Sequence, residues 1–175
     1  MSSSTQSHDL RNRILFTILL LIVYRLGTYV PLSGIDPLAL KEIMASSQKG
    51  LLGMFNMFSG GAVTRMAIFA LGIMPYISAS IVVQLMGIGI PYLQKLQKEG
   101  ESGRKTINQI TRWLTIGICI VQAPAYLYGL SAFGVPDSAF IIGRGPVFMI
   151  SSITILVTGC VFAMWLGEKI TDKGI

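Results

Sequence analysis

The sequence predicts an all-α, polytopic membrane protein, and two observations carry this prediction. The chain has 175 residues, of which 52% are hydrophobic and only 13% charged, whereas soluble domains carry about 25% charged residues. So few charges cannot cover the surface of an apolar domain of this size. In addition, the chain contains four apolar stretches, each comparable to the about 20 residues that a membrane-spanning helix needs.

The first span is expected over residues 14–32, after a polar tail over residues 1–13. Arg11 and Arg13 before an apolar run are also typical of a signal peptide, but no small-x-small cleavage site follows, so we expect a retained span. Arg25 lies inside it, where an unpaired cation is costly. Its side chain either reaches the outer interface or pairs with a group from another part of the protein. An external loop over residues 33–54 follows.

That loop begins a short helix, because Asp36 is placed to cap it and Pro37 to occupy its first position. The next apolar stretch, residues 66–94, carries no charge. As one helix it would measure about 43 Å, against about 30 Å of hydrocarbon.

Gly72 and Pro75 weaken the backbone hydrogen bonding between them, and so they mark a hinge. We therefore expect a half-helix within residues 55–71, entering the membrane from outside, and then a full span over residues 72–93. The alternative interpretation is a Pro-kinked helix whose amphipathic lead-in lies on the membrane surface.

The remaining elements are an inner loop over 94–112, spans over 113–133 and 146–167, an outer loop over 134–145 and an inner tail over 168–175. Basic residues concentrate at the N-terminus, in the inner loop and in the C-terminal tail: Arg11, Arg13, Lys95, Lys98, Arg104, Lys105, Arg112, Lys169 and Lys173, against Lys41, Lys49, Arg65 and Arg144 on the other side. Cytoplasmic loops carry the excess of Lys and Arg, which predicts a cytosolic N-terminus. The net charge of +6 is then a topology signal rather than a sign of DNA binding.

Residue patterns for catalysis are absent from the sequence. His8, the only histidine, lies in the polar tail without a partner for nucleophilic or metal chemistry. The run GESGRKT at 100–106 lacks the glycine spacing of a phosphate-binding loop. Cys119 and Cys160 lie in apolar runs and indicate nothing about redox compartment. We therefore expect a protein that is not an enzyme and has no cofactor.

A stripe along the second span is more informative. Ile73 and Ile77 are four residues apart, and Ser80, Ile81 and Gln84 continue nearly the same helix face. A stripe that changes from branched apolar to polar residues suits the wall of a passage. Hydrogen bonds between helices would equally explain Gln84 and, in the third span, Gln122.

Four sequence runs identify the chain as similar to the SecY family, the channel subunits of the bacterial protein translocase. They are FNMFSGGA at 55–62, FALGIMPYISASI at 69–81, KEGESGR at 98–104 and MWLGEKIT at 164–171, and PLSGID at 31–36 matches the family's loop after the first span. The resemblance implies a fold of ten helices in two five-helix halves around an hourglass pore. This chain would supply the first four helices, and the family continues into a fifth beyond residue 175.

The resemblance also implies site residues. Ile73 and Ile77 match two positions of the pore ring, and Ser78, Ile81, Val82, Gln84 and Gln122 match the lateral gate through which signal sequences intercalate. The half-helix matches the plug that seals the pore from outside: Phe55, Asn56, Met57, Phe58, Ser59, Gly60, Gly61, Ala62, Val63, Thr64, Arg65, Met66, Ala67, Ile68 and Phe69.

The implied function is the movement of unfolded preproteins across the bacterial plasma (inner) membrane, with sideways release of transmembrane segments into lipid. The implied partners are the SecE and SecG membrane subunits, the SecA ATPase, the ribosome, signal peptides and membrane lipid. A secondary transporter with a broken helix is the alternative, although such a protein would normally carry a carboxylate or a polar cluster at the break, and residues 72–77 have none. A purely structural membrane scaffold is the third hypothesis.

Overall fold

A computed structural model describes residues 3–36, 38, 54, 57, 61, 65–132, 140, 141, 143 and 145–174. Within them the helices are α1 (Ser3–Gly27), α4 (Met74–Gly89), α5 (Pro91–Lys98), α6 (Glu101–Ala132) and α7 (Pro146–Lys173). Across this described part, β pairing is limited to isolated bridges, Pro31 with Ala67 and Ile35 with Phe140. The predicted all-α class is confirmed.

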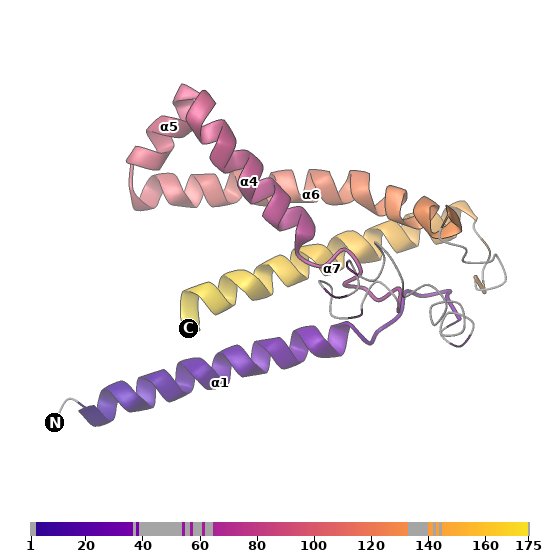
Figure 1. Ribbon diagram of the computed structural model, residues 1–175, viewed down its shortest axis with the longest axis horizontal. Coiled ribbons are helices and arrows are strands. Elements are labelled where there is room, and N and C mark those ends of the chain that lie inside the picture. The colour runs from indigo at the N-terminus through magenta and orange to yellow at the C-terminus, as the bar shows by residue number, and fades with distance from the viewer. Residues whose placement is uncertain are drawn as a thin grey trace.

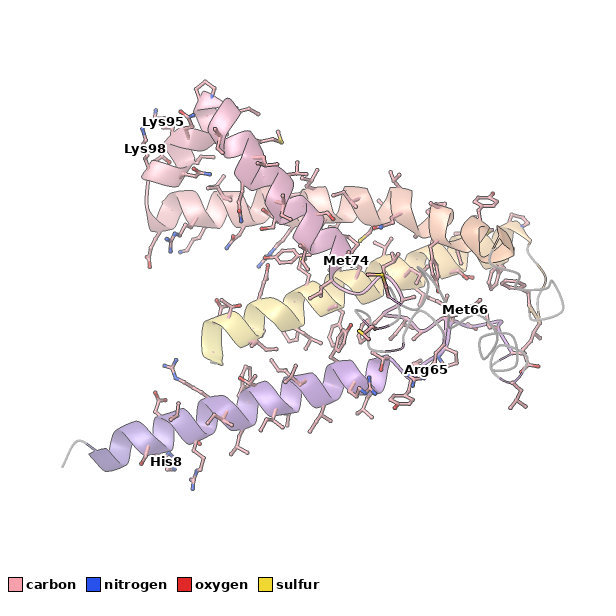
Figure 2. All side chains as sticks on the ribbon, viewed as in Figure 1. His8, Arg65, Met66, Met74, Lys95 and Lys98 are labelled. Atoms are coloured by element: carbon pink, nitrogen blue, oxygen red, sulfur yellow. The ribbon has the colours of Figure 1, made fainter. Side chains whose placement is uncertain are left out.

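The two longest helices, α6 and α7, pack along each other, and α1 packs on α7 (Figure 1). Helix α4 crosses α6, and α5 folds back onto both. Both chain termini and α5 lie toward one end of the molecule, while residues 28–36 and 65–73 lie toward the other (Figure 1). Figure 2 shows Lys95 and Lys98 toward the first of these ends, and Arg65 and Met66 toward the other. We call these the inner and outer ends.

Helices α6 and α7 are each long and apolar enough to cross a membrane, and the bent pair α4 and α5 would make a third span. Four spans were expected, and α1 is the one that differs. It ends at Gly27 instead of Leu32, so its apolar part after Arg13 is shorter than the about 20 residues of a full span. Thr28 begins the turn, because its hydroxyl donates to the Arg25 carbonyl at 2.6 Å. The apolar helices together with the composition make this a membrane protein.

The helices over the span expected at 72–93 and the inner loop expected at 94–112 have other bounds than those ranges. Helix α4 stops at Gly89, and α5 leaves it at an angle of 102°. Pro91 explains the break, because it has no N–H and disfavours a helical residue before it. After a turn at Gly100, α6 is helical from Glu101 and includes Arg104, Lys105 and Arg112.

Small side chains at intervals of four residues allow the helices to approach closely. The buried face of α4, which packs against α6 and α5, consists of Pro75, Ala79, Val83 and Gly87. On α6 the buried residues after Gly103 are Thr111, Thr115, Cys119, Ala123 and Leu127. In lipid, where no hydrophobic effect drives helices together, small residues let the helix backbones approach closely and gain van der Waals contact.

Candidate functional site

The candidate site is the corner at which the chain turns into α4. Gly72 has φ +57°, a left-handed conformation that favours glycine. Ile73 is the N-cap of α4 and Pro75 lies in its first turn, where the missing N–H is no loss. The predicted hinge residues therefore form a sharp corner, since the Gly72 N–H donates to the Phe69 carbonyl at 2.8 Å.

The structure brings Ile73 and Ile77 together on one face of α4, as their spacing predicts. The Ile77 N–H donates to the Ile73 carbonyl at 3.0 Å, and their side chains are 45% and 43% exposed. The opposite face of the same turn, through Pro75 and Ala79, is buried. The first turns of α4 thus present branched apolar side chains away from the helices that support it.

The residues expected at the lateral gate are all exposed, four of them on α4 and one on α6. Ser78, Ile81 and Val82 are exposed on α4. Gln84 is also exposed, and its Nε2 donates to Ser80 Oγ at 3.4 Å, so its amide already has a partner one turn away. Gln122 lies exposed on α6, the helix against which α4 packs.

Residues 65–71, which we call the strap, correct the expected half-helix. They form turns and an isolated bridge, not a helix. The Leu32 N–H donates to the Met66 carbonyl at 2.9 Å, and the Ile68 N–H donates to the Val30 carbonyl at 3.0 Å. Because these two backbone groups pair with residues 30–32, they cannot form the bonds of a helix. The prediction of helix over this part of residues 55–71 is wrong.

Of the residues expected in the plug, the structure describes Met57, Gly61 and residues 65–69. The others lie outside the described residues: Phe55, Asn56, Phe58, Ser59, Gly60, Ala62, Val63 and Thr64. The short helix expected to follow Asp36 also lies largely outside them, although Asp36 Oδ1 accepts the Leu38 N–H at 2.9 Å, as a capping residue would.

Phe69, one of the residues expected in the plug, is buried and 1% exposed. Its ring stacks on Tyr24 of α1, with centroids 5.1 Å apart, and on Phe162 of α7 at 6.0 Å. A Cβ added at Gly27 would overlap this ring. The contact joins residues distant in sequence, and the glycine in the last turn of α1 was the available signal for it.

The outer ends of α1 and the strap also meet through two arginines. The Arg65 guanidinium lies over the Tyr29 ring, 4.1 Å from its centroid, and that of Arg25 lies 5.4 Å from the same centroid. Cations over an aromatic face are favourable. Arg25, whose partner the sequence left open, thus has an aromatic neighbour one turn along the chain.

At the inner end, sequence reasoning missed an ion pair between α6 and α7. The Arg112 Nε donates to Glu168 Oε1 at 2.8 Å, and a second guanidinium nitrogen donates to the other carboxylate oxygen. The pair borders a cavity of about 310 Å³ that is also lined by Gln109, Trp113, Ile116, Val161, Met164 and Trp165. Tryptophans beside charged groups are typical of the membrane interface.

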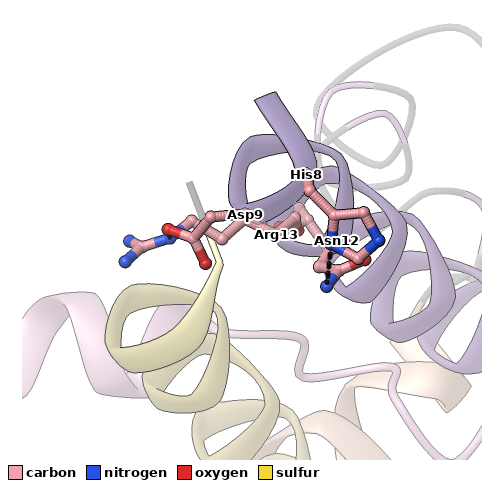
Figure 3. Close-up of polar contacts among 5 residues, drawn as sticks. His8, Asp9, Asn12 and Arg13 are labelled. Carbon is pink, nitrogen blue, oxygen red and sulfur yellow. Dashed lines mark hydrogen bonds and ion pairs between the residues drawn. The ribbon is translucent and has the colours of Figure 1, made fainter. Parts of the chain in front are cut away.

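Two local side-chain pairs lie in the described part of the polar tail. Figure 3 shows His8 beside Asn12 and Asp9 beside Arg13 on the exposed surface of α1. The Asn12 amide lies 3.4 Å from His8 Nδ1, and the Arg13 Nε donates to Asp9 Oδ2 at 3.2 Å. Both pairs are four residues apart along a helix, where such contacts add modestly to helix stability. Within the described ranges, no group of three metal-binding side chains occurs.

The family model and the curated relatives that match this chain all carry the name SecY. The family model of SecY matches residues 67–175. A protein translocase subunit SecY of Rickettsia bellii is 47% identical over 173 residues, which are 99% of this chain and 40% of that protein. The protein of the same name from Escherichia coli K12 is 46% identical over 168 residues, 95% of this chain and 38% of its own length.

A third relative, the protein translocase subunit SecY of Pseudomonas aeruginosa, is 48% identical over 167 residues, 95% of this chain and 37% of that protein. The chain therefore spans about two fifths of the length of the curated relatives it matches. The family model covers more than half of the chain, including the corner at Gly72. On these grounds the chain belongs to the SecY family.

Proposed function

We propose that this chain forms part of the protein-conducting channel of a Sec translocase, which moves unfolded preproteins across a bacterial plasma membrane. The observation that carries the proposal is the pair Ile73 and Ile77. Both are exposed on the first turns of α4, opposite a buried face.

Branched apolar side chains suit such a constriction. A narrow apolar ring excludes ions because water leaves it, which closes the resting channel without a specific contact. The same side chains form no hydrogen bonds with a polypeptide, so any sequence can slide past them. Ser78, Ile81 and Val82 continue the exposed surface toward the middle of α4 and would line the route by which a signal peptide leaves for lipid.

The proposed role is not enzymatic and needs no cofactor in this subunit. The driving force would come from the SecA ATPase or from translation on the ribosome, and SecE and SecG would be the membrane partners. The shared inner end of both termini and α5, with Lys95 and Lys98, supports a cytosolic N-terminus (Figures 1 and 2). The plug assignment of residues before the strap stays a prediction.

The experiment is the resting ion conductance of the complete translocase in planar bilayers. Ile73→Asn and Ile77→Asn should each raise this conductance, because an amide side chain keeps the ring wet. Ile88→Asn is the matched control, since Ile88 is 73% exposed near the other end of α4, and its conductance should equal that of the wild type. Unchanged conductance in both ring variants would favour a scaffold, and uptake of a small solute driven by an ion gradient would favour a transporter.

A further inference from the structure

The strap is tied to the chain that leaves α1. Pro31 and Ala67 face each other in an antiparallel bridge, flanked by the bonds from the Leu32 and Ile68 amides. These flanking bonds make Pro31 and Ala67 a non-hydrogen-bonded pair, in which the two amide groups point away from the partner. Proline therefore removes no bond here, and the strap keeps both of its ties.

A second contact fixes the strap from the other side. Phe69 enters between α1 and α7 and stacks on Tyr24 and Phe162. Gly27 of α1 leaves room for its ring, and Gly159 of α7 leaves room for the Ile68 carbonyl, since a Cβ at either position would overlap these groups. Two helices thus carry glycine where the strap comes closest.

A short hydrogen-bonded turn connects Phe69 to Ile73, the first residue of the candidate pore ring. Its carbonyl accepts the Gly72 N–H at 2.8 Å, Gly72 makes the left-handed corner, and Ile73 follows as the N-cap of α4. The backbone between Phe69, whose ring is held between α1 and α7, and Ile73 is therefore a hydrogen-bonded turn with little freedom to shift.

We propose that Phe69 is a positioning residue for Ile73 and Ile77, and that the strap stays docked on residues 30–32 while a polypeptide passes. This inference rests on the proposed channel function. It assigns to Phe69 a role in holding the chain that leads to Ile73, in addition to the sealing role that the resemblance implies for the plug residues.

The first test locks the strap in place. Pro31→Cys and Ala67→Cys are introduced together in the complete translocase, because Cβ atoms of a non-hydrogen-bonded pair lie about 4.5–5.5 Å apart, close enough for a disulfide after a small adjustment. The single-cysteine variants control for the loss of Pro31 and of Ala67. We expect the oxidised double variant to translocate a preprotein as fast as its reduced form. A loss of translocation on oxidation that a reductant reverses would overturn the docked strap.

The second test measures positioning through the resting conductance per folded complex, a quantity that simple loss of folded protein does not change. Phe69→Ala should raise it, although Phe69 itself is 1% exposed. Trp165→Ala is the matched control, because Trp165 is 46% exposed and stacks on Phe162 rather than on Phe69, and it should leave the conductance unchanged. Equal conductance in Phe69→Ala and wild type would overturn the positioning role.

Gly27→Ala adds an independent measure of the same contact. Alone it should raise the conductance by displacing the ring, and combined with Phe69→Ala it should add nothing further. Additive effects of the two changes would contradict the proposed contact between Gly27 and the Phe69 ring.

If the ring variants Ile73→Asn and Ile77→Asn leave the conductance unaltered, the channel function itself fails. If they raise it and Phe69→Ala does not, only the positioning role fails.

Discussion

The ring of Phe69 occupies the space that a Cβ on Gly27 would need. Gly27 is the last residue of α1, and Phe69 lies in the strap, so this contact sets the distance between the first helix and the segment that leads to α4. It also makes the stability of the protein sensitive to single methyl groups at defined positions.

Gly27→Ala should destabilise the folded protein by about 1–3 kcal/mol, the range for overpacking a filled site. Thermal unfolding in detergent measures the change. Gly117→Ala is the control, because no atom lies within 4 Å of a Cβ added there, and an alanine inside a helix should be neutral or stabilising by up to about 1 kcal/mol. Equal melting temperatures for the two variants would contradict the close contact.

Gly159→Ala should be more damaging than Gly27→Ala. The added Cβ would overlap the Ile68 carbonyl oxygen, a backbone atom, whereas at Gly27 it overlaps a side-chain ring that can tilt. Because the backbone must shift within a packed interior, Gly159→Ala should lower the free energy of unfolding by about 3 kcal/mol or more. The same unfolding assay ranks the two variants, with Gly167→Ala, which has open space around it, as the control in the same helix.

Gly72→Ala should cost about 1–2 kcal/mol through backbone conformation alone. A Cβ at Gly72 would come no closer than 3.9 Å to another group, so crowding contributes nothing, while φ +57° strains any residue with a side chain. Gly72→Asn should be milder than Gly72→Ala, because asparagine tolerates the left-handed region better. A larger loss of stability for asparagine than for alanine would contradict this explanation.

The Arg112–Glu168 pair should contribute about 1 kcal/mol of coupling between α6 and α7, the upper end for a partly exposed bidentate pair. A double-mutant cycle with Arg112→Gln and Glu168→Gln measures it. The side chains are 49% and 18% exposed, so the coupling should weaken in high salt. The Arg13–Asp9 pair on α1, exposed on both sides, serves as the reference and should give about 0.3–0.5 kcal/mol.

The apolar interiors of the helices were predictable from the sequence, but most of the helix ends were not. Helix α7 begins at Pro146 as expected, because proline at a first position is a local signal. Helix α6 extends inward to Glu101, since charged residues are good helix formers and hydropathy does not register them. Helix α4 ends early because Pro91 terminates it.

The structure of the strap could not be predicted from the sequence, because it depends on contacts between distant parts of the chain. Its non-helical form depends on hydrogen bonds to residues 30–32, far away in the chain, and no local pattern in residues 65–71 encodes them. The spacing of Ile73 and Ile77 predicted their common face correctly, since it depends only on helix geometry. The role of Phe69 depends on Gly27, Phe162 and Gly159 meeting in space, which a linear pattern cannot reveal.

The bridge between Pro31 and Ala67 has one more consequence. In such a pair the amide of each residue would point to its outer edge, away from the partner, and Pro31 has no amide hydrogen to offer there. An extended chain that approaches this edge finds a gap in the row of donors, as in natural sheets that place proline at an edge to prevent strand addition. The segment after α1 can therefore pair with the strap without offering its outer edge to a strand from another chain.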